Sequence, residues 1–401
     1  MTLQLIQNQS QSQEFARAWM APDGSCTLVG SCCSSALTLR GRAGVTSSVM
    51  RLWALGQHAP LDKHNGSMAY NVRTWRDACW FPAMERANAA SCAFATCAQR
   101  VPIQLWDAYY GTRRASYVPL NAASEELAET YAIAMTTSKL VAAVSASTNG
   151  KTAALVMFDL AVPEKVSVKL DVHSSLKGAP ASVDIASKAS LSPFVALGLR
   201  NGDVGLFDMA HSSQKPLKVL RNVHSDGVAQ VHFVNMCAGD TATTDLLVTV
   251  GRKTDNTIRV WDLRNLSQSL MQWTRPSSGT AQPSLVDSTE EALLYGDAHG
   301  FLFTRSFRSL TDELLWATAI TKSARDEDHI TDTPWHKTPF GPVSSVSVAL
   351  RPAADGAVLC VTAGERRRST SCAGDESDGD RDTSESNSEE GTTILQVLKA
   401  W

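Results

Sequence analysis

Four side chains near the middle of the chain have the spacing of a hydrogen-bonded relay. They are His224, Thr249, Asp255 and Trp261. In such a relay the indole N–H, the hydroxyl, the imidazole and the carboxylate follow one another. Buried Trp and His tips need polar partners, and this order supplies a partner to each of them. The alternative interpretation is that the four are ordinary residues at strand ends.

The elements that must position this relay are short strands. Three apolar or alternating runs end at Phe233, Val250 and Asp262, and turn residues such as 251–256 separate the last two runs. This pattern predicts consecutive antiparallel strands. A closing Trp-Asp pair after a β-branched run, with a His before the first strand, is typical of a WD-type propeller blade.

Similar units recur along the chain. Blade-ending Trp-Asp or Phe-Asp pairs stand at 106–107, 158–159, 207–208 and 261–262, about fifty residues apart, near the repeat length of propellers with long loops. The predicted units cover residues 15–40, 74–117, 130–159, 181–208, 224–264, 284–305 and 343–401. We therefore expect an all-β fold, a single seven-bladed WD-repeat β-propeller over residues 1–401.

The last unit has three strands by this count, and a propeller is stable only when its ring closes. Residues 3–6 are therefore expected to add the fourth strand and to latch the two ends of the chain together.

Several stretches lack this periodicity. After a third strand expected at 37–39, residues 41–74 are interpreted as a long connection, and residues 321–342 as another. Loops of such length are usually functional or disordered. Residues 369–391 are rich in Ser, Asp and Glu and contain no large apolar residue, which predicts a disordered acidic loop inside the last unit. A solvating loop and a loop modified by acidophilic kinases both fit this composition.

The composition is that of a soluble globular protein. Of the 401 residues, 43% are apolar and 19% are charged, with a formal charge of -3. A nucleic-acid site must therefore be a local patch. No run approaches about 20 apolar residues, and no secretory signal is expected. The nine cysteines form no C-x-x-C pair and no cluster with zinc spacing, which points to reduced thiols in the cytosol or nucleus and to no metal site.

Catalytic motifs are not found in the sequence. It contains no Gly-rich phosphate loop, no G-x-S-x-G elbow and no H-E-x-x-H pair, and its histidines share no motif. We therefore expect neither an enzyme nor a cofactor.

Binding has more support. In a propeller, the turns between the second and third strands of all blades emerge on one face. Cations stand in these turns at Arg100, Lys151, Arg200, Arg252, Lys253, Arg366 and Arg367. Such a rim attracts phosphates, and Arg can also stack on bases. The alternative is that these are solvated turn residues. Arg100 stands where a relay Asp is expected, so its charge either meets a ligand or pairs with Asp107.

Four stretches resemble the telomerase Cajal body proteins, which are WD-repeat subunits of telomerase and of small Cajal-body ribonucleoproteins. The strongest is Pro102–Tyr117, which is similar to the family's Pro-Ile-His-x-Trp-Asp-Ala-x-x-Gly-x-x-Arg-Ala-Ser-aromatic run. Trp19–Cys26 resembles the opening blade, and Cys79–Met84 resembles a segment of Cys, Trp and an aromatic residue. Gly251–Lys253 together with Trp261–Arg264 resembles the fifth blade.

The resemblance implies recognition of a single-stranded loop in box H/ACA RNA or telomerase RNA. It also implies H/ACA core or telomerase proteins as partners, a nuclear location such as the Cajal body, and no membrane. Within such a complex the propeller is expected to be monomeric. Arg252 and Lys253 match both the family pattern and the cationic rim. The turns at 147–152 and 296–300 have drifted from the family. The alternative is a protein-only WD-repeat scaffold that binds acidic peptides.

Overall fold

The protein is described here by a computed structural model. It describes residues 3–11, 14–33, 47–54, 67–70, 75–121, 125–146, 152–172, 176–186, 194–208, 215–238, 242–252, 254–275, 285–289, 292–297, 301–307, 336–337, 343–350, 357–363 and 393–400. In these ranges every regular element is a β-strand. No helix in the described part of the chain has the length and apolar character needed to cross a bilayer.

The described strands form seven four-stranded antiparallel sheets. In chain order they are β1 (Leu3–Gln11), β2 (Glu14–Met20), β3 (Cys26–Cys33), β4 (Ser47–Ala54), β5 (Ser67–Tyr70), β6 (Trp75–Trp80), β7 (Ala93–Ala98), β8 (Val101–Asp107), β9 (Arg113–Tyr117), β10 (Thr130–Met135), β11 (Lys139–Ser145), β12 (Ala153–Asp159), β13 (Val162–Asp171), β14 (Pro180–Ile185), β15 (Phe194–Leu199), β16 (Val204–Asp208), β17 (Lys218–Leu220), β18 (Val228–Ala238), β19 (Ala242–Gly251), β20 (Thr257–Asp262), β21 (Met271–Thr274), β22 (Asp287–Ser288), β23 (Ala292–Gly296), β24 (Phe301–Ser306), β25 (His336–Lys337), β26 (Val343–Leu350), β27 (Ala357–Ala363) and β28 (Thr393–Ala400).

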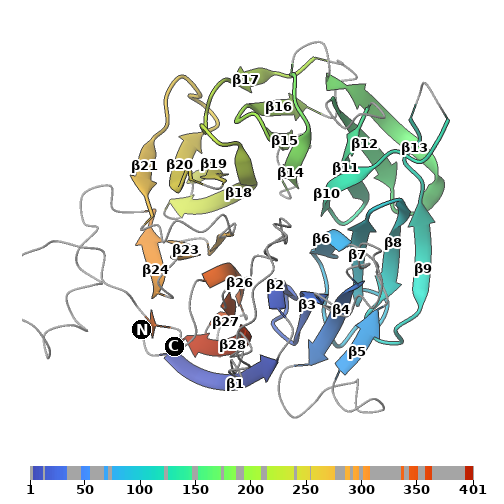
Figure 1. Ribbon diagram of the computed structural model, residues 1–401, viewed down its shortest axis with the longest axis vertical. Helices are drawn as coiled ribbons and strands as arrows, with labels where there is room; N and C mark the ends of the chain where they lie inside the picture. The colour runs from blue at the N-terminus through green and yellow to red at the C-terminus, as the bar shows by residue number, and fades with distance from the viewer. Residues whose placement is uncertain are drawn as a thin grey trace, which may run out of the picture.

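The sheets follow one another around a common centre, which is a propeller-like arrangement (Figure 1). Strands β2, β6, β10, β14 and β18 lie on the inside (Figure 1), and they contact one another in order: β2 contacts β6, β6 contacts β10, β10 contacts β14 and β14 contacts β18. Contacts between β26 and β2 bring the last sheet against the second strand of the chain.

The first strand of the chain completes the last sheet. β1 pairs antiparallel with β28, from Leu3 opposite Ala400 to Gln11 opposite Thr393, and the two strands lie side by side (Figure 1). The sequence places a strand at 3–6 in this role, and the strand in the structure is longer. This pairing joins the two ends of the chain in one sheet.

The core lies between the sheets. Strand β7 is buried along its whole length, and β12 is buried as far as Phe158. A strand in a sheet that packs on both faces loses the alternation of polar and apolar residues, as these two strands do. Side chains from neighbouring sheets meet in shared clusters, for example Leu155 with Val195 and Leu197.

The long connection expected over residues 41–74 is wrong, because the structure places strands β4 and β5 there. These strands extend the first sheet beyond the expected bounds of 15–40. Arg51 interrupts the apolar run of β4, so the local pattern did not reveal a strand whose pairing with β3 and β5 is tertiary. The strand expected at 37–39 lies outside the described residues.

Four outer strands were also missed. β13, β17, β21 and β25 lie beyond the expected unit ends at 159, 208, 264 and 305, and β25 lies within the expected connection 321–342. Where their side chains are described, these strands are partly exposed, as in β21. Exposed outer strands carry little of the apolar pattern that identifies strands. In the fifth sheet, the expected polar connection after Phe233 instead continues as β18 and β19. The acidic stretch 369–391 lies outside the described residues.

Candidate nucleic-acid interface

The relay residues form one hydrogen-bonded chain in the fifth sheet. The Trp261 indole Nε1 on β20 donates to Thr249 Oγ1 on β19 at 3.1 Å. His224 Nε2 lies 3.1 Å from the same oxygen, and His224 Nδ1 lies 3.3 Å from Asp255 Oδ2. Thr257 is a further member that the sequence analysis missed, because its Oγ1 lies 3.1 Å from His224 Nδ1.

The charge states in this chain follow from burial. His224 is 1% exposed, and burial lowers the pKa of its imidazole although Asp255 opposes this effect. For Asp255, burial raises the pKa, but hydrogen bonds from Thr257 and Ser225 outweigh burial and lower it. A neutral imidazole with its proton on Nδ1 donates to Asp255 and accepts from Thr249, which satisfies every member. The hydrogen-bonded relay therefore fixes the turn between β19 and β20.

This turn carries Arg252 and lies against the turn that carries Arg200. The Arg252 amide donates to the Gly227 carbonyl at 3.0 Å. Gly227 has φ 99°, and a Cβ built there would lie 2.5 Å from the Arg200 carbonyl oxygen. Glycine is therefore required where the fourth and fifth sheets meet. Through Gly227 the backbones of the two arginine turns are held close together.

The charge of Arg200 also affects the guanidinium group of Arg252. Burial lowers the pKa of Arg252 most, and the charge of Arg200 lowers it further. Arg200 is exposed and Arg252 is half-buried. Among the described residues, neither arginine forms an ion pair with a carboxylate. Two adjacent cations without an acid partner favour an anion between them.

An aromatic layer lies beside this pair. The Arg76 guanidinium lies 4.1 Å from the centroid of the Tyr131 ring, and that of Arg200 lies 5.3 Å from it. Glu129 forms an ion pair with Arg76 and accepts a 3.0 Å hydrogen bond from the Tyr131 hydroxyl. Arg76 also donates to the Thr130 carbonyl at 3.3 Å. Arg76 and Tyr131 are therefore held in place before any ligand binds.

Arg76 and Tyr131 were not identified from the sequence. Each is the second residue of an inner strand, at a β-bulge between Trp75 and Asp77 in β6 and between Thr130 and Ala132 in β10. A bulge turns a side chain out of the regular strand alternation. The available signal was an Arg and an aromatic residue at the same position of consecutive units, before the expected apolar positions.

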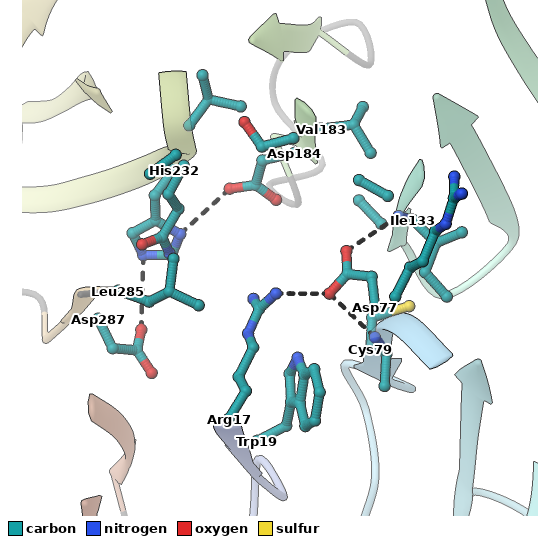
Figure 2. A pocket seen from close by; sticks show the side chains of 18 of the residues that line it. Arg17, Trp19, Asp77, Cys79, Ile133, Val183, Asp184, His232, Leu285 and Asp287 are labelled. Carbon is teal, nitrogen blue, oxygen red and sulfur yellow. Dashed lines mark hydrogen bonds and ion pairs between the residues drawn. The ribbon is translucent and has the colours of Figure 1, made fainter. Parts of the chain in front are cut away.

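A cavity of about 290 Å³ opens beside this layer, among the inner strands. Figure 2 shows polar side chains from several sheets that meet across it. His232 Nδ1 lies 3.2 Å from Asp184 Oδ2, and its Nε2 lies 3.6 Å from Asp287 Oδ1. The Arg17 guanidinium donates to Asp77 Oδ1 at 2.7 Å.

Two of these carboxylates, those of Asp77 and Asp184, also accept backbone hydrogen bonds from the next sheet. Asp77 Oδ2 accepts from the Ile133 amide at 3.1 Å, and Asp184 Oδ2 accepts from the Phe233 amide at 2.8 Å. The carboxylates are therefore engaged in joining sheets.

The remaining predicted cations are placed as follows. Arg100 is exposed in the turn between β7 and β8 with φ 57°, and Trp75 pairs with Ala98, so Arg100 lies at the same end of the second sheet as Arg76. Of the two alternatives for Arg100, the pair with Asp107 is not formed, because Asp107 Oδ2 binds Arg114 at 2.6 Å. Lys151, Lys253, Arg366 and Arg367 lie outside the described residues.

The fold and this cluster define an all-β, propeller-like protein with a basic and aromatic surface beside its central cavity. The chain is 27% identical over 229 residues to a protein of Drosophila melanogaster named Telomerase Cajal body protein 1 homolog. The match covers 56% of this chain and 39% of that protein, so this chain spans less than half of the relative's length. This similarity supports a distant relationship. A search against protein-family models found no match.

Proposed function

We propose that this protein is a non-catalytic RNA-binding and scaffold subunit of telomerase or of a box H/ACA small Cajal-body ribonucleoprotein. It recognises a single-stranded RNA loop and aids particle assembly or nuclear localisation. Its partners are the H/ACA or telomerase RNA and the core proteins of that particle. The name of the distant relative supports this class of complex.

The fold that carries this function is a closed, seven-bladed WD-repeat propeller. The described sheets, the contacts between β26 and β2 and the pairing of β1 with β28 support closure. A closed ring holds the turns of different blades at fixed separations on one face. RNA loops present unpaired bases and phosphates together, and a rigid face with several arginines matches both.

The observation that carries the proposal is the adjacent pair Arg200 and Arg252. Among the described residues, neither guanidinium forms an ion pair with a carboxylate. Bringing two cations together costs free energy unless an anion joins them. The backbone contacts at Gly227 nevertheless keep the two turns together.

The first test is crosslinking in cells followed by sequencing of the attached RNA. Enrichment of H/ACA-type RNAs or telomerase RNA supports the proposal. A protein-only scaffold would show no RNA above background and would keep its partners after nuclease treatment. That outcome would contradict the proposal and favour the alternative, a protein-only scaffold that binds acidic peptides.

A second test uses the purified protein. The double substitution of Arg252→Glu and Lys253→Glu is expected to weaken binding of the crosslinked RNA by about tenfold or more, because it reverses the charge of Arg252 and of the residue that follows it in the sequence. Binding by the unaltered protein should weaken steeply as salt rises. Arg264→Glu is the matched control, because Arg264 is an exposed arginine of the same sheet that already pairs with Asp262. Equal loss in both variants would contradict a specific role for Arg252.

A further inference from the structure

The cluster beside the cavity divides into a neutral part and a cationic part. Glu129 compensates the charge of Arg76 and fixes both Arg76 and Tyr131. Arg200 extends over the same ring from the fourth sheet and forms no ion pair with a carboxylate among the described residues. The Arg252 amide donates to the Gly227 carbonyl at 3.0 Å, and Gly227 packs against the Arg200 carbonyl, so the backbones that carry the two arginines are held side by side. The charge without a carboxylate partner therefore lies beside the Tyr131 ring.

We propose that this cluster binds a single unpaired nucleotide, with its phosphate between Arg200 and Arg252 and its base stacked on the layer that Tyr131 and Arg200 form. This inference rests on the proposed RNA-binding function and assigns residues and a ligand class to it. The planar guanidinium of Arg200 serves both parts of the nucleotide, because Arg forks onto phosphate and also stacks on bases.

The surroundings favour a nucleotide over an isolated phosphate or a duplex. Arg76 and Tyr131 line the cavity of about 290 Å³, so a base on this layer meets open space and not a packed wall. That volume is at the lower end of small-ligand pockets, which span about 300–1,000 Å³. A duplex keeps its bases stacked inside and cannot offer one to this layer.

The test compares two probes of equal length and charge: a short oligouridylate and an abasic ribose-phosphate oligomer. The unaltered full-length protein is expected to bind the oligouridylate about tenfold more tightly, because each stacked base adds affinity. Arg200→Lys keeps the positive charge but removes the planar guanidinium group. It is expected to bring the two affinities close together without changing the salt dependence.

Matched variants separate the base contact from the phosphate contact. Tyr131→Leu should also remove the preference for the oligouridylate, whereas Tyr131→Phe should keep it, because the ring remains. Arg252→Gln should weaken both probes by the same factor and reduce the salt slope by about one unit. Circular dichroism of each variant verifies that the all-β fold persists.

The outcomes distinguish this inference from the proposed function. Binding of neither probe, nor of crosslinked cellular RNA, by the unaltered protein would overturn the RNA function itself. RNA binding with no preference for the oligouridylate, or a preference that survives Arg200→Lys and Tyr131→Leu, would overturn the nucleotide site alone. Displacement of the oligouridylate by an equally tight acidic peptide would also overturn it and favour a peptide at the same cations.

Discussion

At the scale of single residues, the Thr249 hydroxyl joins two buried members of the relay. Its hydroxyl accepts from Trp261 Nε1 and lies within hydrogen-bonding distance of His224 Nε2, and its side chain is fully buried. Removal of this oxygen leaves a buried indole N–H and a buried imidazole nitrogen without their partner. Buried groups that lose a partner cost about 1–3 kcal/mol each.

We therefore expect Thr249→Val to lower the free energy of unfolding by about 2–4 kcal/mol. Urea unfolding followed by tryptophan fluorescence measures this change. Thr96→Val is the matched control in the second sheet, where Thr96 Oγ1 accepts from Trp106 Nε1 and no relay histidine is present. The control substitution should lower the free energy of unfolding by a smaller amount. Equal losses at the two sites would mean that the His224 contact adds nothing.

At the scale of elements, His232 on β18 joins three sheets across the cavity. Burial disfavours its charged form, but the hydrogen bond and charge of Asp184 on β14, with the charge of Asp287 on β22, outweigh burial and raise the pKa of the imidazole above its usual value of 6.5. The charge of Arg17 on β2 opposes this rise. The protonated imidazole therefore holds β14, β18 and the strand that begins the sixth sheet together.

The sign of the pH dependence follows from the raised pKa. The folded state holds the proton more tightly than the unfolded state does, so the stabilisation is complete below about pH 6.5 and is lost as pH rises through the folded pKa. The thermal midpoint of the unaltered protein should exceed that of His232→Gln most at mildly acidic pH, and the difference should shrink as pH rises. Calorimetry across this range measures it. A difference that grows with pH would contradict stabilisation by the protonated imidazole of His232.

At the scale of the whole molecule, the pairing of β1 with β28 joins the beginning and the end of the chain. Deletion of residues 1–11 removes one strand of the last sheet and exposes the edge of β28. We expect this deletion to lower the thermal midpoint strongly and to promote aggregation, because unpaired strand edges bind other chains. An unchanged midpoint would show that the stability of the protein does not depend on β1.

The opposite change tests the same pairing of β1 with β28 without loss of sequence. Asn8 and Gln396 stand opposite each other in the β1–β28 pair. The double substitution Asn8→Cys and Gln396→Cys should stabilise the oxidised protein by about 2–4 kcal/mol, because the crosslink restricts the unfolded chain. The reduced form of the same variant is the control in the denaturation experiment.

Local patterns in the sequence were sufficient for the repeated sheets and for the relay. The spacing of Thr249, Asp255 and Trp261 lies within one hairpin, so strand pairing alone brings these side chains together. The alternating and apolar runs likewise marked most inner strands, because burial between sheets requires such residues. The exposed outer strands and β4 lacked this signal, since their pairing depends on neighbours and not on their own composition.

The candidate site was decided by tertiary structure. The sequence placed Arg200 and Arg252 in turns of neighbouring units, but their proximity depends on the contact of Gly227 with the Arg200 backbone. Arg76 and Tyr131 joined them because bulges in β6 and β10 turn these side chains toward the same layer. Residue types and spacing along the chain determined most of the inner strands and the cations of the turns. The packing of sheet against sheet decided which charges lack a partner and which ring lies beside them, because those contacts join residues far apart in the chain.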